Sequence, residues 1–203
     1  MRRVRARLVA LPAAELRRLL VGLAVLTLVQ SAFTVWLAAS TEQSHDLAID
    51  LVAVLVIGWS FAGTGLFAWW RRPANPVGPL MWLTGFCWFF NLYTLSGFQP
   101  LFVFGFLVTN VSYAFLINLL LVFPDGRLET RLERAVVAGG YFVVIVVQLV
   151  GAFLVDPELA GCDGCPENPL LLTGDDAASD LFNAVQSLFA MAVLIGLVFA
   201  LIR

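Results

Sequence analysis

The chain has no lysine, one histidine and three cysteines in 203 residues, so all twelve of its basic residues are arginines. No ionisable side chain lies well inside any of its long apolar runs. Pumps and proton-coupled transporters place such groups within the membrane, because charge movement needs carriers. This absence argues against an ion-coupled transporter and leaves a facilitator of neutral solutes open.

Apolar residues dominate the chain: 61% are hydrophobic and the mean hydropathy is +0.91. Soluble domains contain about 45–50% apolar residues, and a membrane-spanning helix needs about 20 in succession. Six spans are predicted, at about 19–39, 49–70, 80–97, 101–123, 131–155 and 178–202. Residues 1–18 form an arginine-rich arm and 156–177 the longest loop. Little sequence remains for a soluble catalytic domain, and we identify no catalytic residue, cofactor or metal, so we do not expect an enzyme.

The charges are distributed asymmetrically between the predicted loops. All twelve arginines fall in the N-terminal arm, the second and fourth loops and the C-terminus, whereas ten of the fourteen acidic residues fall elsewhere. Loops rich in arginine stay in the cytoplasm. We therefore predict an all-α polytopic membrane protein, a six-transmembrane-helix bundle with both termini cytoplasmic (N-in/C-in). Its partner is the bilayer of the plasma membrane, and no nucleic-acid partner is expected.

The first span could also be a cleaved signal peptide, since its flank is basic and Ala38-Ala39-Ser40 is a site of small residues. Its 21 apolar residues exceed the usual apolar region of such peptides, which is about 7–15 residues long. We favour a retained span.

Several uncharged polar residues interrupt the spans. Asn110 and Asn118 are eight residues apart and share one face of the fourth span. We favour hydrogen bonds between helices for them, each worth about 0.6–2 kcal/mol, over a role in lining a ligand cavity. Gln186, with Asn183 on the same face of the sixth span, is expected to bond to Gln148 of the fifth span.

The sequence Cys162-Asp-Gly-Cys165 lies in the last outer loop. The outer side of a membrane is oxidising, and Asp163-Gly164 turns tightly, so we favour a disulfide. A redox-active pair is a second interpretation, although the surrounding acidic residues disfavour reactive thiolates. A metal site that adds His45 is a third. Cys87, within the third span, is interpreted as a small buried apolar residue.

Two cytoplasmic turns are predicted from proline and glycine. Pro73, Pro76 and Pro79 with Gly78 exclude helix before the third span. Phe123-Pro124-Asp125-Gly126-Arg127 ends the fourth span, because proline stops the helix and Asp-Gly favours a turn. Thr130-Arg-Leu-Glu133 then forms a capping box, which predicts that the fifth helix begins near Thr130.

Together, these turns carry a resemblance. The stretch 71–80, with Asn75, Pro76 and Gly78, and the stretch 123–128, with Pro124, Asp125, Gly126 and Arg127, resemble the N-terminal membrane region of multi-span sensor histidine kinases from high-GC Gram-positive bacteria. The stretch Cys162–Leu170 is also similar to that group. The resemblance implies a sensory input domain of a two-component system, which transmits a stimulus through its last helix to a cytoplasmic effector. A homodimer formed through the kinase region and a cognate response regulator are also implied.

The kinase domains of such proteins follow the last span, and this chain ends at Arg203, so we expect it to be either the sensor region separated from them or a stand-alone relative. Two alternatives remain. A membrane thiol oxidoreductase would use Cys162 and Cys165 and predicts thiol-dependent turnover. A small neutral-solute facilitator lined by Asn110 and Asn118 predicts flux.

The topology can be tested with single cysteines and a membrane-impermeant thiol reagent. Cysteines introduced at Ser44 and Asp175 should be labelled from outside the cell, whereas those at Asn75 and Gly126 should react only after lysis. The reverse pattern would reject the orientation.

Overall fold

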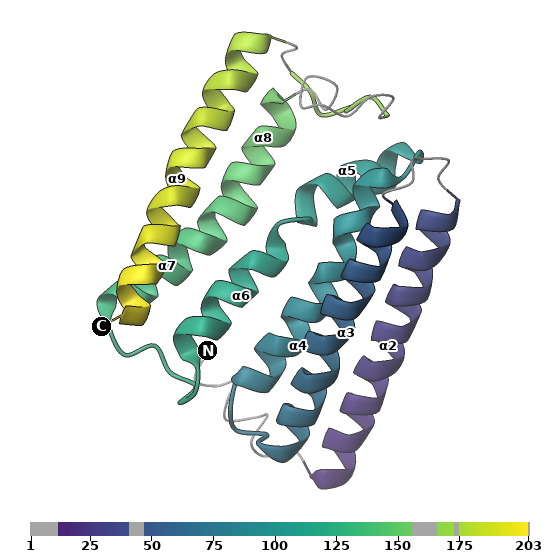
Figure 1. Cartoon of the computed structure of the whole chain (residues 1–203), viewed down its shortest axis with the longest axis vertical. Helices are drawn as coiled ribbons and strands as arrows, with labels where there is room; N and C mark the ends of the chain where they lie inside the picture. Colours follow the sequence, from purple (N-terminus) through teal and green to yellow (C-terminus); the bar gives the residue numbers. More distant parts are fainter. Residues whose placement is uncertain (1–11, 41–46, 156–165, 173–174, 203) are drawn as a thin grey trace.

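A computed structural model describes residues 12–40, 47–155, 166–172 and 175–202, and every regular element among them is helical (Figure 1). The all-α class is therefore confirmed for these residues. The elements are the α-helices α2 (Ala13–Ala39), α3 (Leu47–Arg71), α4 (Val77–Trp88), α5 (Gln99–Val108), α6 (Val111–Val122), α7 (Arg131–Phe142), α8 (Gln148–Leu154) and α9 (Asp176–Ile202), the 3₁₀-helix η1 (Phe89–Leu95) and the π-helix η2 (Val143–Val147).

Five helical segments of the described chain are long and apolar enough to cross a membrane, which indicates a membrane protein. They are Ala13–Ala39, Leu47–Arg71, Gln99–Val122, Arg131–Leu154 and Asp176–Ile202. The expected third span corresponds to α4 followed by η1, which have 12 and 7 residues and differ in helix type. A sixth span remains a prediction.

Six of the helices, α2, α3, α4, α6, α7 and α9, pack side by side in a row. Helix α2 contacts α3, α3 contacts α4, α4 contacts α6, α6 contacts α7 and α7 contacts α9. Figure 1 shows α2 and α9 at opposite sides of this row. Helix α4 is central, because it also contacts α2 through the Trp82 indole, whose Nε1 donates to Thr27 Oγ1 at 3.0 Å.

The described arginines gather at one end of the bundle. They lie near the start of α2, in the α3–α4 and α6–α7 connections or in the adjoining helix turns, and Figure 1 shows these places together with the end of α9. We call this the arginine end. The opposite end, with the η1–α5 and α8–α9 connections, carries Glu167, Asp175 and Asp176, and we call it the acidic end. Which end faces the cytoplasm remains a prediction.

Helices α3 and α4 approach closely through glycines. A Cβ atom on Gly65 would lie 2.4 Å from the Trp82 backbone nitrogen, and one on Gly85 would lie 2.4 Å from the Ala62 nitrogen. Gly78 approaches the Trp69 backbone in the same way, at 2.5 Å. Small residues allow membrane helices this proximity, and van der Waals packing then holds them together.

Several boundaries differ from the sequence prediction. Helix α4 starts at Val77 and includes Pro79, because the first-turn N–H groups of a helix have no intrahelical partner and proline loses nothing there. The non-helical turn predicted from the prolines is therefore confirmed over residues 72–76, and the expectation that it extends to Pro79 is wrong. Helix α2 starts at Ala13, inside the expected arm, and its Leu16 and Leu20 pack against Trp69.

The capping box before α7 is confirmed. Thr130 Oγ1 accepts from the Glu133 backbone N–H at 3.1 Å, and Glu133 Oε2 accepts from the Thr130 N–H at 3.3 Å. Helix α7 begins at Arg131, as the box predicted.

The α3–α4 contact can be tested with one methyl group. Gly65→Ala should destabilise the folded protein by about 1–3 kcal/mol, because the new Cβ meets a backbone that cannot move aside. Gly63→Ala is the matched control in the same helix, since nothing lies within 4 Å of its Cβ position. The measurement is thermal unfolding in detergent. Equal melting temperatures for the two variants would contradict the close contact.

Candidate functional site

The apolar segment Gln99–Val122 is interrupted near its middle. Helix α5 ends at Val108 and α6 begins at Val111. The last carbonyl groups of a helix have no intrahelical partner, which is costly at membrane depth where water is absent. Gln148 Nε2 donates to one of them, the Phe106 oxygen, at 2.8 Å. From the other side, Thr109 Oγ1 donates to Asn91 Oδ1 at 3.3 Å.

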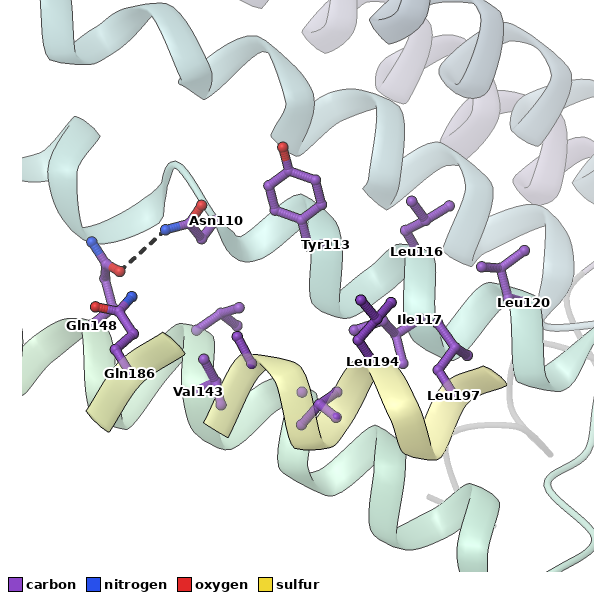
Figure 2. Close-up of a pocket in the computed structure, with 14 residues that line it drawn as sticks. Asn110, Tyr113, Leu116, Ile117, Leu120, Val143, Gln148, Gln186, Leu194 and Leu197 are labelled. Atoms are coloured by element: carbon purple, nitrogen blue, oxygen red, sulfur yellow. Dashed lines mark hydrogen bonds between the residues drawn. The ribbon is translucent and has the colours of Figure 1, made fainter. Parts of the chain in front are cut away.

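Gln148 connects this interruption to the next segment. Its side chain is 6% exposed, and its Oε1 accepts from Asn110 Nδ2 at 3.2 Å (Figure 2). It is the first residue of α8, immediately after η2, and its backbone N–H donates to the Val143 carbonyl five residues earlier. The amide group of Gln148 thus bonds to both sides of the α5–α6 interruption.

A second polar contact joins the same two segments. Asn118 Nδ2 donates to the Tyr141 hydroxyl oxygen at 3.3 Å. Asn110 and Asn118 therefore both face the segment Arg131–Leu154, and each bonds to a side chain there. These are hydrogen bonds between helices, the first of the two roles considered for them.

A cavity of about 390 Å³ lies between α6, α7–α8 and α9 (Figure 2), a volume typical of ligand sites. None of its lining residues is charged. Asn110, Gln148 and Gln186 are grouped at one end, with Tyr113 next to them. The remaining lining residues have no polar side-chain atom: Leu116, Ile117, Leu120, Gly140, Val143, Val144, Ala190, Val193, Leu194 and Leu197.

Gln186 points into the cavity beside Gln148 (Figure 2), but the expected bond between them is not formed. Gln148 bonds to Asn110 and Phe106 instead. The Gln186 amide has no hydrogen-bond partner among the described residues, and Asn183, one turn earlier on α9, is exposed. The prediction of a Gln186–Gln148 bond is therefore wrong, because the carbonyl released at the α5–α6 interruption takes the Gln148 donor.

The two proline- and glycine-rich turns meet at the arginine end. Asn75 Nδ2 donates to the Pro124 carbonyl at 3.2 Å, and Asn75 Oδ1 accepts from the Val77 N–H at 3.0 Å. Gly126 has a positive φ of 74°, and a Cβ there would lie 2.7 Å from both Asn75 Oδ1 and Pro76 Cδ. Both its conformation and this approach require glycine.

A hollow of about 240 Å³ adjoins these turns. Asp125, Arg127 and Glu133 line it, together with Ala200 and Leu201 from the last turn of α9. The loop that follows α6 therefore lies beside the end of α9.

Cys162, Cys165 and His45 lie outside the described residues, so the disulfide, redox and metal interpretations stay predictions. Cys87 is buried in α4.

Sequence reasoning missed three residues of the site, Thr109, Tyr113 and Tyr141. Each carries a hydroxyl group inside an apolar run, which is the signal that could have found them. Comparisons of the chain with protein-family models, curated proteins and solved structures found no match.

Removing the Gln148 amide should be costly. Gln148→Leu leaves the Phe106 carbonyl and the Asn110 amide without their partner, and we expect a loss of about 1–3 kcal/mol in unfolding free energy. Asn183→Leu is the control, since Asn183 is exposed and has no side-chain hydrogen bond in the described structure. Unfolding in detergent measures both variants. A stability of Gln148→Leu equal to that of Asn183→Leu would show that the bonds around Gln148 contribute nothing.

Proposed function

We propose that the chain is the membrane-embedded input domain of a two-component sensor histidine kinase. It crosses the plasma membrane six times with its arginine end in the cytoplasm, and α9 transmits the stimulus to a cytoplasmic kinase domain. Dimerisation through that domain and phosphotransfer to a response regulator follow from the same proposal. Its supports are the resemblance carried by the two turns and the way α9 is held.

The packing of α9 is the observation that carries the proposal. Only Ser179 and Leu197 of this 27-residue helix are buried. At the acidic end, Ser179 Oγ donates to the Leu154 carbonyl at 3.1 Å. At the arginine end, Leu197 packs with Leu121 and Val136. Between these two points α9 borders the cavity. A helix with few buried contacts shifts or rotates at a lower energetic cost than a central one.

The arginine end offers a path for such a shift. The last turn of α9 borders the hollow that Asp125 and Arg127 also line. The same loop is bonded to the α3–α4 turn through Asn75 and Pro124. A displacement of α9 would therefore change its contacts with a loop that is fixed to the tightly packed helices. A stimulus biases the shift only if it interacts differently with the two arrangements.

One observation, the uncharged cavity, also suits the alternative of a neutral-solute facilitator. A facilitator of this kind should allow a small neutral solute to enter proteoliposomes that contain the chain, and this uptake can be measured. No feature of the described residues favours a thiol oxidoreductase, since the sulfur of Cys87 is buried.

The proposal predicts that the contact of α9 with α7 at the arginine end controls the activity of an attached kinase. The chain is fused after Arg203 to a histidine-kinase catalytic core and reconstituted in liposomes. Gly196→Val should change basal autophosphorylation roughly 3- to 30-fold, the effect of about 0.6–2 kcal/mol on a two-state balance. The reason is that a Cβ on Gly196 would lie 2.8 Å from Val136 Cγ2 and force α9 away from α7.

Gly22→Val in α2 is the matched control, because nothing lies within 4 Å of its Cβ position. It should leave autophosphorylation unchanged. If Gly196→Val folds and inserts normally and yet gives the same output as Gly22→Val, displacement of α9 is not the signal.

A further inference from the structure

We infer that the cavity between α6, α7–α8 and α9 binds a neutral single-chain amphiphile from the membrane, whose uncharged carbonyl or hydroxyl oxygen is held by Gln186, Gln148 and Asn110. The statement that this ligand is the stimulus of the sensor rests on the proposed function. The binding of the ligand to the cavity is independent of that function and can be measured separately.

The lining excludes a charged ligand. Ten of the fourteen lining residues have no polar side-chain atom, and none is charged. A charged group would lose its hydration without gaining an ionic partner. The ligand must therefore be mostly apolar and uncharged.

Depth in the bundle supports the same conclusion. Asn110 lies eleven residues after Gln99 and twelve before Val122, so the polar end of the cavity is at the middle of the Gln99–Val122 segment. That is about 16–18 Å from either end at 1.5 Å per residue. Charges at the centre of a bilayer are costly, whereas a carbonyl or hydroxyl group needs only a hydrogen bond.

The cavity is elongated along the helices. From Asn110 its lining continues along α6 to Leu120, a rise of about 15 Å. On α9 it continues from Gln186 to Leu197, over a similar distance. Leu194 borders the cavity and is 53% exposed, so the cavity is open beside it and an apolar chain can enter there from the lipid.

The polar end has unused hydrogen-bonding capacity. The Gln186 amide has no partner among the described residues, and an unsatisfied amide in an apolar medium costs several kcal/mol. Among the described residues, Gln148 Oε1 accepts only from the Asn110 amide (Figure 2), and a carbonyl oxygen can accept from a second donor. An oxygen atom of the ligand placed here would accept from Gln186 and give that amide its partner.

Irregular backbone borders the polar end on two sides. The α5–α6 interruption includes Asn110, and the π-helix η2 contributes Val143 and Val144. Non-helical backbone at membrane depth occurs where it is buried in protein or lines a cavity, and π-turns are frequent at functional sites. Interrupted helices also form the midplane binding sites of many transporters.

The test uses the 203-residue chain in lipid nanodiscs and dodecanamide with a mid-chain diazirine as the probe. Photolabelling should concentrate on α6 and α9, on the cavity residues between Tyr113 and Leu120 and between Ala190 and Leu197. Unlabelled dodecanamide and dodecan-1-ol should compete. Dodecane-1-sulfonate, which is permanently charged, and dodecane, which has no oxygen, should compete at least about tenfold less well. Equal competition by all four compounds would overturn the inference.

Three variants locate the site. Gln186→Leu should weaken probe binding roughly 3- to 10-fold, the effect of one lost hydrogen bond. Ala190→Phe should abolish it by filling the cavity. Leu188→Phe is the matched control for Ala190→Phe. Leu188 precedes Ala190 by two residues, lies on the opposite side of α9 and is 71% exposed. Melting temperatures establish that each variant is folded. Labelling spread evenly over lipid-facing residues and unaffected by Ala190→Phe would reject the site.

The kinase fusion separates the two proposals. Probe binding that is lost in Ala190→Phe but never changes autophosphorylation would support the site and reject the ligand as the stimulus. No specific probe binding, with the response to Gly196→Val intact, would reject the site and leave the signalling role of α9 standing.

Discussion

Helices α3 and α4 lie so close that a single Cβ atom on Gly65 or Gly85 would meet the backbone of the facing helix at 2.4 Å. The rest of the bundle depends on this contact because α4 is central. Its other sides contact α6, through Val77 and Leu119, and α2, through the Trp82 indole. The α3–α4 contact therefore fixes the position of four helices, and it needs no polar group, since close packing is the main attraction available between apolar helices in lipid.

Helix α9 is packed differently. It is anchored at its two ends, by the Ser179 hydroxyl and by Leu197, while its middle borders the cavity. The bundle thus combines a rigid part, where glycines allow backbone contact, with a more weakly held last helix. This contrast is what a transmitting element requires, because the rigid part provides a frame against which α9 can shift. The loop at Asp125 lies between the two parts at the arginine end.

Polar groups in the apolar interior decide where the segments are irregular. The α5–α6 interruption releases the Phe106 carbonyl, and Gln148 satisfies it from the next segment. This bond occupies the Gln148 amide nitrogen, and Gln186 faces the cavity without a partner in the described structure. The interruption is thereby linked to the segment Arg131–Leu154 through Gln148, and the Gln186 amide lies beside this link at the polar end of the cavity.

The sequence by itself determined the helical class, the apolar segments and the gathering of arginines at helix ends, since these follow from composition and from local chemistry. It also determined the start of α7, because a capping box is formed by residues three apart. The interruption at Thr109–Asn110, the partner of Gln148, the meeting of Asn75 with Pro124 and the cavity were decided only by the tertiary structure. Each depends on atoms 38 or more residues apart, or on several helices at once, and no local pattern states which amide will find which carbonyl.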